Sequence, residues 1–192
     1  MRLLNLRSVV AIFFFATLFS CTKDVTKQTP AQTEAEDATQ ALRVGQAFGG
    51  GIIFYLDATK QHGYIAATQD QGGQVAWDKG THNLIGAKGK ALGTGKANTN
   101  KIVNALGTTG NYAALICKNY RGGGFSDWFL PSKAELLKLY NKRDKVGGFS
   151  DTNYWSSTEV DAEDALNVVF PGPFQETDFK GFTLRVRPIR SF

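Results

Sequence analysis

The order of apolar and polar positions divides the chain into three parts. An apolar run from Val9 to Phe19 follows a basic start and ends just before Cys21. This run is too short to span a bilayer comfortably and is typical of a signal-peptide core. Residues 22–42 are polar and contain no aromatic side chain, so they bury too little surface to offset their ordering entropy. The pattern predicts a signal peptide (1–20), a flexible tether that begins at Cys21 (21–42) and one domain (43–192).

Alternating apolar, β-branched and aromatic residues predict strands at both ends of this domain. Ile52–Leu56 and Tyr64–Ala67 flank a polar turn that ends in Gly63, which indicates a β-hairpin. Further strand-like stretches are "QVAW", "NYWSST", "ALNVVF" and "FTLRVRPIRSF", with a turn at "PGP". Strands at both ends with helices between them predict an α+β domain whose terminal strands are adjacent.

Helical spacing predicts three short helices in the middle of the domain. The first covers Thr99–Leu106, and the second starts near Asn111 and stops before the glycines at 122–124. The third begins at Ser132 and Glu135, which form a capping box, and ends at Gly147. Its buried stripe is predicted to contain Leu136, Leu137 and Tyr140, with Lys142, Arg143 and Lys145 near the negative end of its dipole.

Charge is segregated along the domain. Between Lys79 and Ser126 there are seven basic and no acidic residues, and between Asp151 and Phe179 there are seven acidic and no basic residues. The two segments either neutralise each other side by side or leave a basic face for an acidic partner. Residues 78–98 are rich in Gly, Lys, Thr and Asn, which predicts a long loop of the kind that often carries function. The candidate binding residues in and just after this stretch are Lys88, Lys90, Lys96 and Lys101.

An anionic polysaccharide, sulfated or rich in uronic acid, is the partner that such a loop would suit, and a surface protein is the alternative. Lys is a flexible point charge, so recognition is expected to be loose and driven by charge. Nucleic acid is not an expected partner for an exported protein.

The stretch "NYWSSTEV" raises the question of catalysis. Ser156 or Ser157 would need a base, and only His62 and His82 are available, without a G-x-S-x-G pattern. The only Cys in the domain, Cys117, has apolar spacing and is predicted to be a small buried hydrophobe. Two isolated His and one Cys lack the spacing of a zinc site, whereas calcium held by scattered loop oxygens stays open. We therefore expect no catalytic residue, and we assign neither a metal ligand nor a cofactor.

The residues "LFSC" that end the apolar run resemble the lipobox of bacterial lipoproteins. This resemblance implies cleavage before Cys21 and a diacylglycerol on its sulfur. Each buried acyl CH₂ contributes about 0.8 kcal/mol, so two or more chains hold a protein stably on a membrane. The expected location is the cell envelope, at the outer membrane or the cell surface.

The stretches "GGGIIFYLD", "DWFLPSKAEL", "YWSSTE" and "LRVRPIRSF", together with "HGYIAA", "GTGKANT" and "NYAALIC", resemble the DUF1566 or Lcl C-terminal domain family. The resemblance covers about residues 45–192 and implies a C-type-lectin-like domain with paired terminal strands, short helices and long irregular loops. The residues that carry it, expected to be structural, include Trp128, Pro131, Ser132, Glu135, Trp155, Ser156, Arg185 and Arg187.

The resemblance implies a non-catalytic, adhesion-like binding module for glycans or proteins. The Glu-Pro-Asn and Trp-Asn-Asp motifs of calcium-dependent lectins are absent from the sequence. One alternative is an enzyme, because formylglycine-generating enzymes share a related fold, although they use cysteine pairs. A purely structural envelope lipoprotein is the other alternative.

Overall fold

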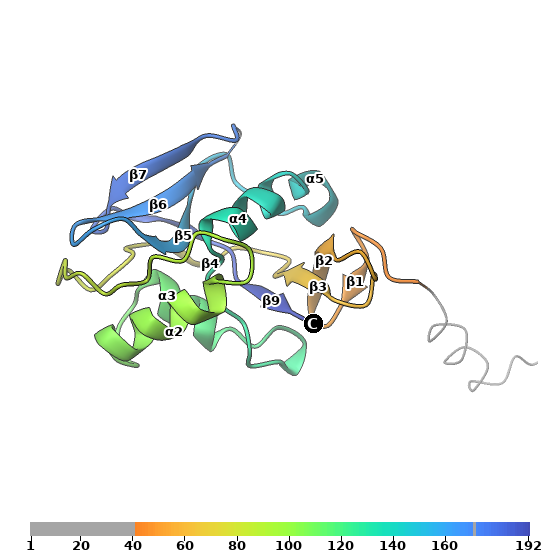
Figure 1. The fold of residues 1–192 in the computed structure, drawn as a ribbon, viewed down its shortest axis with the longest axis horizontal. Helices are drawn as coiled ribbons and strands as arrows, with labels where there is room; N and C mark the ends of the chain where they lie inside the picture. Colours follow the sequence, from red (N-terminus) through yellow and green to blue (C-terminus); the bar gives the residue numbers. More distant parts are fainter. Residues whose placement is uncertain (1–40, 171) are drawn as a thin grey trace, which may run out of the picture. The chain divides into compact units, whose positions relative to one another are not determined.

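The structure is a computed structural model that describes residues 41–170 and 172–192. The predicted signal peptide, Cys21 and the tether up to residue 40 lie outside the described residues. Residues 41–192 form one compact unit, shown as the coloured ribbon in Figure 1.

Two sheets make up the β part of this unit. The first has the order β1-β2-β3-β9, and the second has the order β4-β8-β5-β6-β7. The first sheet consists of β1 (Ala47–Phe48), β2 (Gly51–Leu56), β3 (Gly63–Ala66) and β9 (Ile189–Ser191). The second consists of β4 (Gln71–Val75), β5 (Asn153–Glu159), β6 (Asp164–Val169), β7 (Gln175–Phe179) and β8 (Leu184–Val186). Neighbouring strands are antiparallel, except that β5 and β8 are parallel.

Short helices fill the chain between the sheets' strands. They are α2 (Gly95–Leu106), α3 (Ala113–Asn119), the 3₁₀ turn η1 (Gly122–Gly124), α4 (Lys133–Tyr140) and α5 (Arg143–Val146). The α+β prediction is confirmed. In the described part of the chain, none of the helices has the length and apolar character needed to cross a membrane.

The second sheet is covered by helices on both faces. Successive strand residues point to opposite faces, and Tyr154 and Trp155 in β5 do so. Trp155 packs in a cluster with the buried side chains of α2 and α3, whereas Tyr154 packs in another cluster with those of α4. β5 is the middle strand of the second sheet, so "NYWSST" lies between the two clusters.

The last predicted strand is divided between the two sheets. β8 joins the second sheet, the chain then passes through Arg187 and Pro188, and β9 joins the first sheet. Pro188 has no N–H to donate, so it interrupts a ladder. The terminal strands lie in one sheet, as expected, and the last strand pairs with β3, the second strand of the predicted hairpin. The positive φ angles of Gly49 and Gly50 turn β1 back onto one edge of β2, and β9 pairs with β3 at the other side of the hairpin.

Several boundaries also differ from the prediction. The predicted third helix is two helices in the structure. The first, α4, ends at Tyr140, and the second, α5, contains Arg143 and Lys145. The buried stripe of α4 contains Leu136, Leu139 and Tyr140, while Leu137 is only partly buried. The hairpin β2–β3 and the capping box of Ser132 and Glu135 are confirmed.

Candidate functional site: the basic loop and its scaffold

The hydroxyl groups of "NYWSST" hold the fold together. Ser156, Ser157 and Thr158 are buried. Ser156 Oγ donates to the backbone of β6 at 2.7 Å, Asn98 Nδ2 donates to Ser157 Oγ at 3.3 Å, and Thr158 Oγ1 donates to Gly89 O at 2.8 Å. Neither histidine of the domain is a hydrogen-bond partner of these hydroxyls. The loop before α2 therefore packs against this stretch of β5.

Glu159, the last residue of β5, holds that loop by its backbone. Residues 83–94, named here the basic loop, run along the end of β5. The Glu159 carboxylate accepts hydrogen bonds from the backbone N–H groups of residues 85, 86 and 87 at 2.8, 2.6 and 3.2 Å. The Glu159 N–H in turn donates to Ala87 O at 2.9 Å. These contacts fix the first half of the basic loop.

Lys180 supplies the countercharge of Glu159. The two side chains are fully buried, and Lys180 Nζ lies 2.8 Å from Glu159 Oε1. Nζ also donates to the backbone oxygens of Asn83, Asp161 and Ala162, and it lies 4.8 Å from the centroid of the Trp77 ring. A buried charge needs both a partner and hydrogen bonds, and this ammonium group has both.

Glu135 holds the second half of the basic loop. Its carboxylate accepts from Ser132 N at 2.7 Å, which closes the capping box of α4, and from Gly93 N at 2.8 Å. Burial raises the pKa of Glu135. A Cβ on Gly95 would lie 2.2 Å from Glu135 Oε2, so α2 starts at a residue without a side chain.

Residues of α2 and of the start of α4 hold the middle of the loop through its backbone groups. Asn98 accepts from Gly89 N at 3.1 Å and donates to Gly89 O at 2.7 Å, in the manner of a paired strand residue. Ala134 N donates to Lys90 O at 3.0 Å, and Ser132 Oγ donates to Ala91 O at 2.9 Å. The path of the loop is thus defined without using the lysine side chains.

The four candidate lysines are exposed, but they do not all lie in a loop as expected: Lys88 and Lys90 are in the basic loop, and Lys96 and Lys101 are in α2. Lys101 differs from the others, because its Nζ donates to Gly86 O at 3.0 Å and supports the loop. Within residues 41–170 and 172–192, none of the four forms an ion pair. Lys88, Lys90 and Lys96 therefore present positive charge from a fixed backbone.

The basic and acidic segments meet where the basic loop packs on the end of β5. Backbone N–H groups of Asp164 and Glu163 lower the pKa of Asp161, and the charges of Lys180 and Lys88 lower it further. The most buried acid of the acidic segment, Glu159, is paired with Lys180 from outside both segments. The segments adjoin, but no ion pair in the described part of the chain links them.

Two of the predicted signature residues hold the chain around α4. Trp128 is buried, packs edge-on against Tyr120 and donates from Nε1 to Gly122 O at 3.2 Å. Pro131 O accepts from Ser157 N at 2.7 Å. Both contacts are structural.

The two arginines of the closing strand have different environments. Arg187 is fully buried, lies 2.7 Å from Asp70 Oδ1 and donates to the carbonyls of Ala67, Gly147 and Gly148. Arg185 is partly exposed and lies 4.0 Å from Asp70 Oδ2. Arg187 therefore fastens the end of α5 to the junction between the sheets.

The described residues contain no cluster of three or more His, Cys, Asp or Glu suited to a metal ion. Cys117 is buried as predicted, and burial raises the pKa of its thiol. His82 lies 3.3 Å from Asp78 and packs against the Phe179 ring, whereas His62 is exposed. Sequence reasoning missed Lys180, Asn98 and Asp70, which have partners 21, 59 and 117 positions away along the chain.

No model of a protein family matches the sequence, and no curated protein matches it. Among solved structures, the fold is similar to that of a fimbrial protein from Bacteroides ovatus, with a TM-score of 0.52 and 14% sequence identity. The match covers 79% of this chain and 45% of the fimbrial protein, so the chain spans less than half of that protein. At this identity, the likeness shows that the two proteins share a fold.

Proposed function

We propose that this protein is a lipid-anchored, non-catalytic binding module of the bacterial cell envelope, whose basic loop binds anionic polysaccharide. The observation that carries the proposal is the scaffold of the basic loop. Two buried carboxylates, Glu159 and Glu135, fix the loop backbone. Lys88 and Lys90 in the loop and Lys96 in the first turn of α2 remain exposed. A contact surface that is already ordered loses less entropy when it binds.

The state of the candidate catalytic groups supports a non-catalytic role. Ser156, Ser157 and Thr158 are buried and bonded to the fold, and the thiol of Cys117 is buried as well. A C-type-lectin-like arrangement of the DUF1566 type remains our proposal for the fold family. The similar fold in a fimbrial protein supports a role at the cell surface.

Heparin is a suitable probe for this proposal. Changing Lys88, Lys90 and Lys96 to Gln should lower heparin affinity about tenfold at low salt, since each exposed ion pair contributes roughly 0.2–1 kcal/mol. Binding of the unchanged protein should weaken as salt rises, because exposed charges are screened over about 8 Å at physiological ionic strength.

A matched control removes the same charge elsewhere. The variant Lys60→Asn, Lys142→Gln, Lys145→Gln loses three positive charges away from the loop, and Asn suits the positive φ of Lys60. Equal losses in the two variants, or no heparin binding at low salt, would remove the basic loop from consideration.

A further inference from the structure

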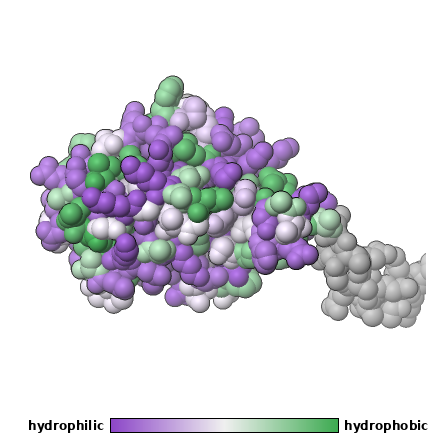
Figure 2. Space-filling model, in the orientation of Figure 1, coloured by the Kyte–Doolittle hydropathy of each residue, from purple (hydrophilic) through white to green (hydrophobic). Residues whose placement is uncertain are grey.

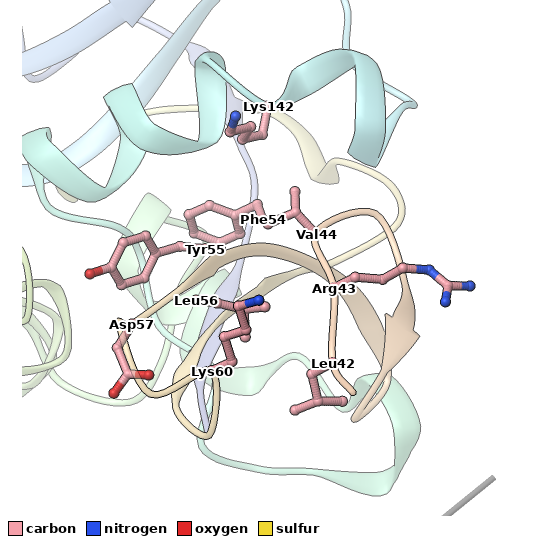
Figure 3. A pocket seen from close by; sticks show the side chains of 9 residues that line it. All are labelled: Leu42, Arg43, Val44, Phe54, Tyr55, Leu56, Asp57, Lys60 and Lys142. Carbon is pink, nitrogen blue, oxygen red and sulfur yellow. The ribbon is translucent and has the colours of Figure 1, made fainter. Parts of the chain in front are cut away.

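A groove lies at the end of the domain where the described chain begins. It has a volume of about 410 Å³. Leu42, Val44 and Leu56 contribute apolar surface, and Arg43, Lys60 and Lys142 contribute positive charge. Figure 3 shows Lys142 on one side of the rings of Phe54 and Tyr55 and Lys60 on the other, with the Arg43 guanidinium pointing outward. We name this site the basic groove.

Further positive charge surrounds the basic groove. Lys138 Nζ lies 4.8 Å from the centroid of the Tyr55 ring, and the Lys145 side chain packs next to Gly45. The carboxylate that lines the groove belongs to Asp57 and accepts a hydrogen bond from Thr59 Oγ1 at 2.7 Å. In the parts of the chain that the structure describes, none of these basic side chains forms an ion pair.

We propose that the basic groove docks the domain onto a bilayer surface through its anionic phosphate headgroups. Cations around an apolar floor match a phosphate layer above acyl chains, and basic residues near an anionic membrane are attracted to it within a Debye length. Position as well as charge indicates that the groove binds a membrane surface. Leu42 and Arg43 line the groove, and Cys21 precedes Leu42 by 21 residues.

The covalent connection keeps a membrane within reach. A chain of 21 residues spans at most about 70 Å, even when fully extended. The proximity argument therefore rests on the lipid anchor of the proposed function. Tethering gives the groove a high effective concentration of headgroups, so a weak contact is sufficient to orient the domain. None of residues 83–94 lines the groove, and the proposal gives the basic loop no part in this contact.

Vesicle binding without the anchor tests the groove independently of lipidation. The chain is produced without residues 1–20 and with Cys21→Ser, and it is sedimented with vesicles of phosphatidylcholine alone or of equal parts phosphatidylcholine and phosphatidylglycerol. We expect binding to the anionic vesicles only. The double variant Lys60→Asn, Lys142→Gln should weaken it roughly 25-fold, since each basic residue near the surface contributes about a fivefold change.

The control variant Lys118→Gln, Lys133→Gln loses the same charge outside both the basic groove and the basic loop and should retain vesicle binding. Equal losses in both variants would show that only net charge matters and would overturn the proposal. The proposal would also be overturned if the protein bound uncharged and anionic vesicles equally well. A variant Lys60→Asn, Lys142→Gln that lost heparin binding but retained vesicle binding would overturn it too. A failure of the proposed polysaccharide binding is detected separately, by the heparin affinity of the variant in which Lys88, Lys90 and Lys96 are changed to Gln.

Discussion

The buried pair of Glu159 and Lys180 is predicted to be a major source of stability for the basic loop. Changing Glu159 to Gln retains the size of the side chain but leaves one oxygen acceptor where the carboxylate serves three backbone N–H groups and Lys180. A buried N–H group without a partner costs about 1–3 kcal/mol. Removing one partner of a buried ion pair costs about 3–5 kcal/mol. These costs overlap, so we expect a total loss of about 3–5 kcal/mol, a large fraction of a typical unfolding free energy of roughly 5–15 kcal/mol.

Urea denaturation followed by tryptophan fluorescence measures this loss, because Trp77, Trp128 and Trp155 are all buried. Hydrogen exchange at residues 85–87 should accelerate in the same variant. Glu163→Gln removes an exposed acid from the same segment and should change stability by less than about 0.5 kcal/mol.

A second variant separates charge burial from hydrogen bonding. Lys180→Met in the Glu159→Gln background removes the charge that has lost its partner, so the double variant should be more stable than Glu159→Gln alone. If Glu159→Gln costs no more than Glu163→Gln and the amides of residues 85–87 exchange as slowly as before, the scaffold described here does not hold the loop.

Other residues give predictions of the same kind. Trp155→Ala should cost about 3–5 kcal/mol, since the ring is fully buried and Nε1 donates to Val75 O at 2.9 Å; a stable mutant that has lost only ligand binding would place Trp155 at a binding surface. Cys21→Ala should abolish lipidation and release the protein from membranes, as intact mass and detergent partitioning would show; an unmodified Cys21 in a water-soluble mature wild-type chain would contradict the anchor. Burial raises the pKa of Tyr154 from 10.0 to about 12, so its contribution to stability is present below pH 10 and is lost as pH rises towards 12; Tyr154→Phe should flatten this alkaline loss in urea denaturation. The pKa of Glu135 is raised as well, so the stability that its protonated form contributes is complete below about pH 4.5 and declines as pH rises. The unfolding free energy of the wild type should therefore fall relative to that of Glu135→Gln as pH rises above 4.5.

Elements with local signals were predictable from the sequence. The β2–β3 hairpin has its turn glycine next to alternating apolar residues, and α4 has the capping box of Ser132 and Glu135. β7 was missed because its sequence, "QETDF", is polar and exposed, as suits an edge strand paired with β6. The start of α2 was missed because Gly95 is a poor helix former, and the need for a glycine there comes from Glu135, 40 positions further along the chain.

The site was predictable only in part. Exposure of Lys88, Lys90 and Lys96 was an expectation from composition, and the structure places them at the surface. Their scaffold was not predictable, since Glu159 reaches residue 85 across 74 positions and residue 87 across 72. Contacts this distant leave no periodic pattern. Figure 2 shows hydrophobic residues scattered among hydrophilic ones on the face in view, so hydropathy alone would not have marked a binding surface either.

Electrostatics and preorganisation predict opposite changes in heparin affinity when Glu159 is changed to Gln. Glu159→Gln removes a negative charge next to the loop and leaves the positive charge of Lys180, so electrostatics alone predicts tighter heparin binding. In the wild type the Glu159 contacts order residues 85–87 before any partner arrives, and the variant would have to order them on binding. Three residues would have to be ordered, at roughly 1–2 kcal/mol of backbone entropy each, which exceeds the roughly 0.2–1 kcal/mol that one ion pair contributes at a protein surface. Heparin affinity of Glu159→Gln, measured at low salt where the variant remains folded, should therefore fall. An increase would mean that the charge of the lysines, and not the order of their backbone, determines binding.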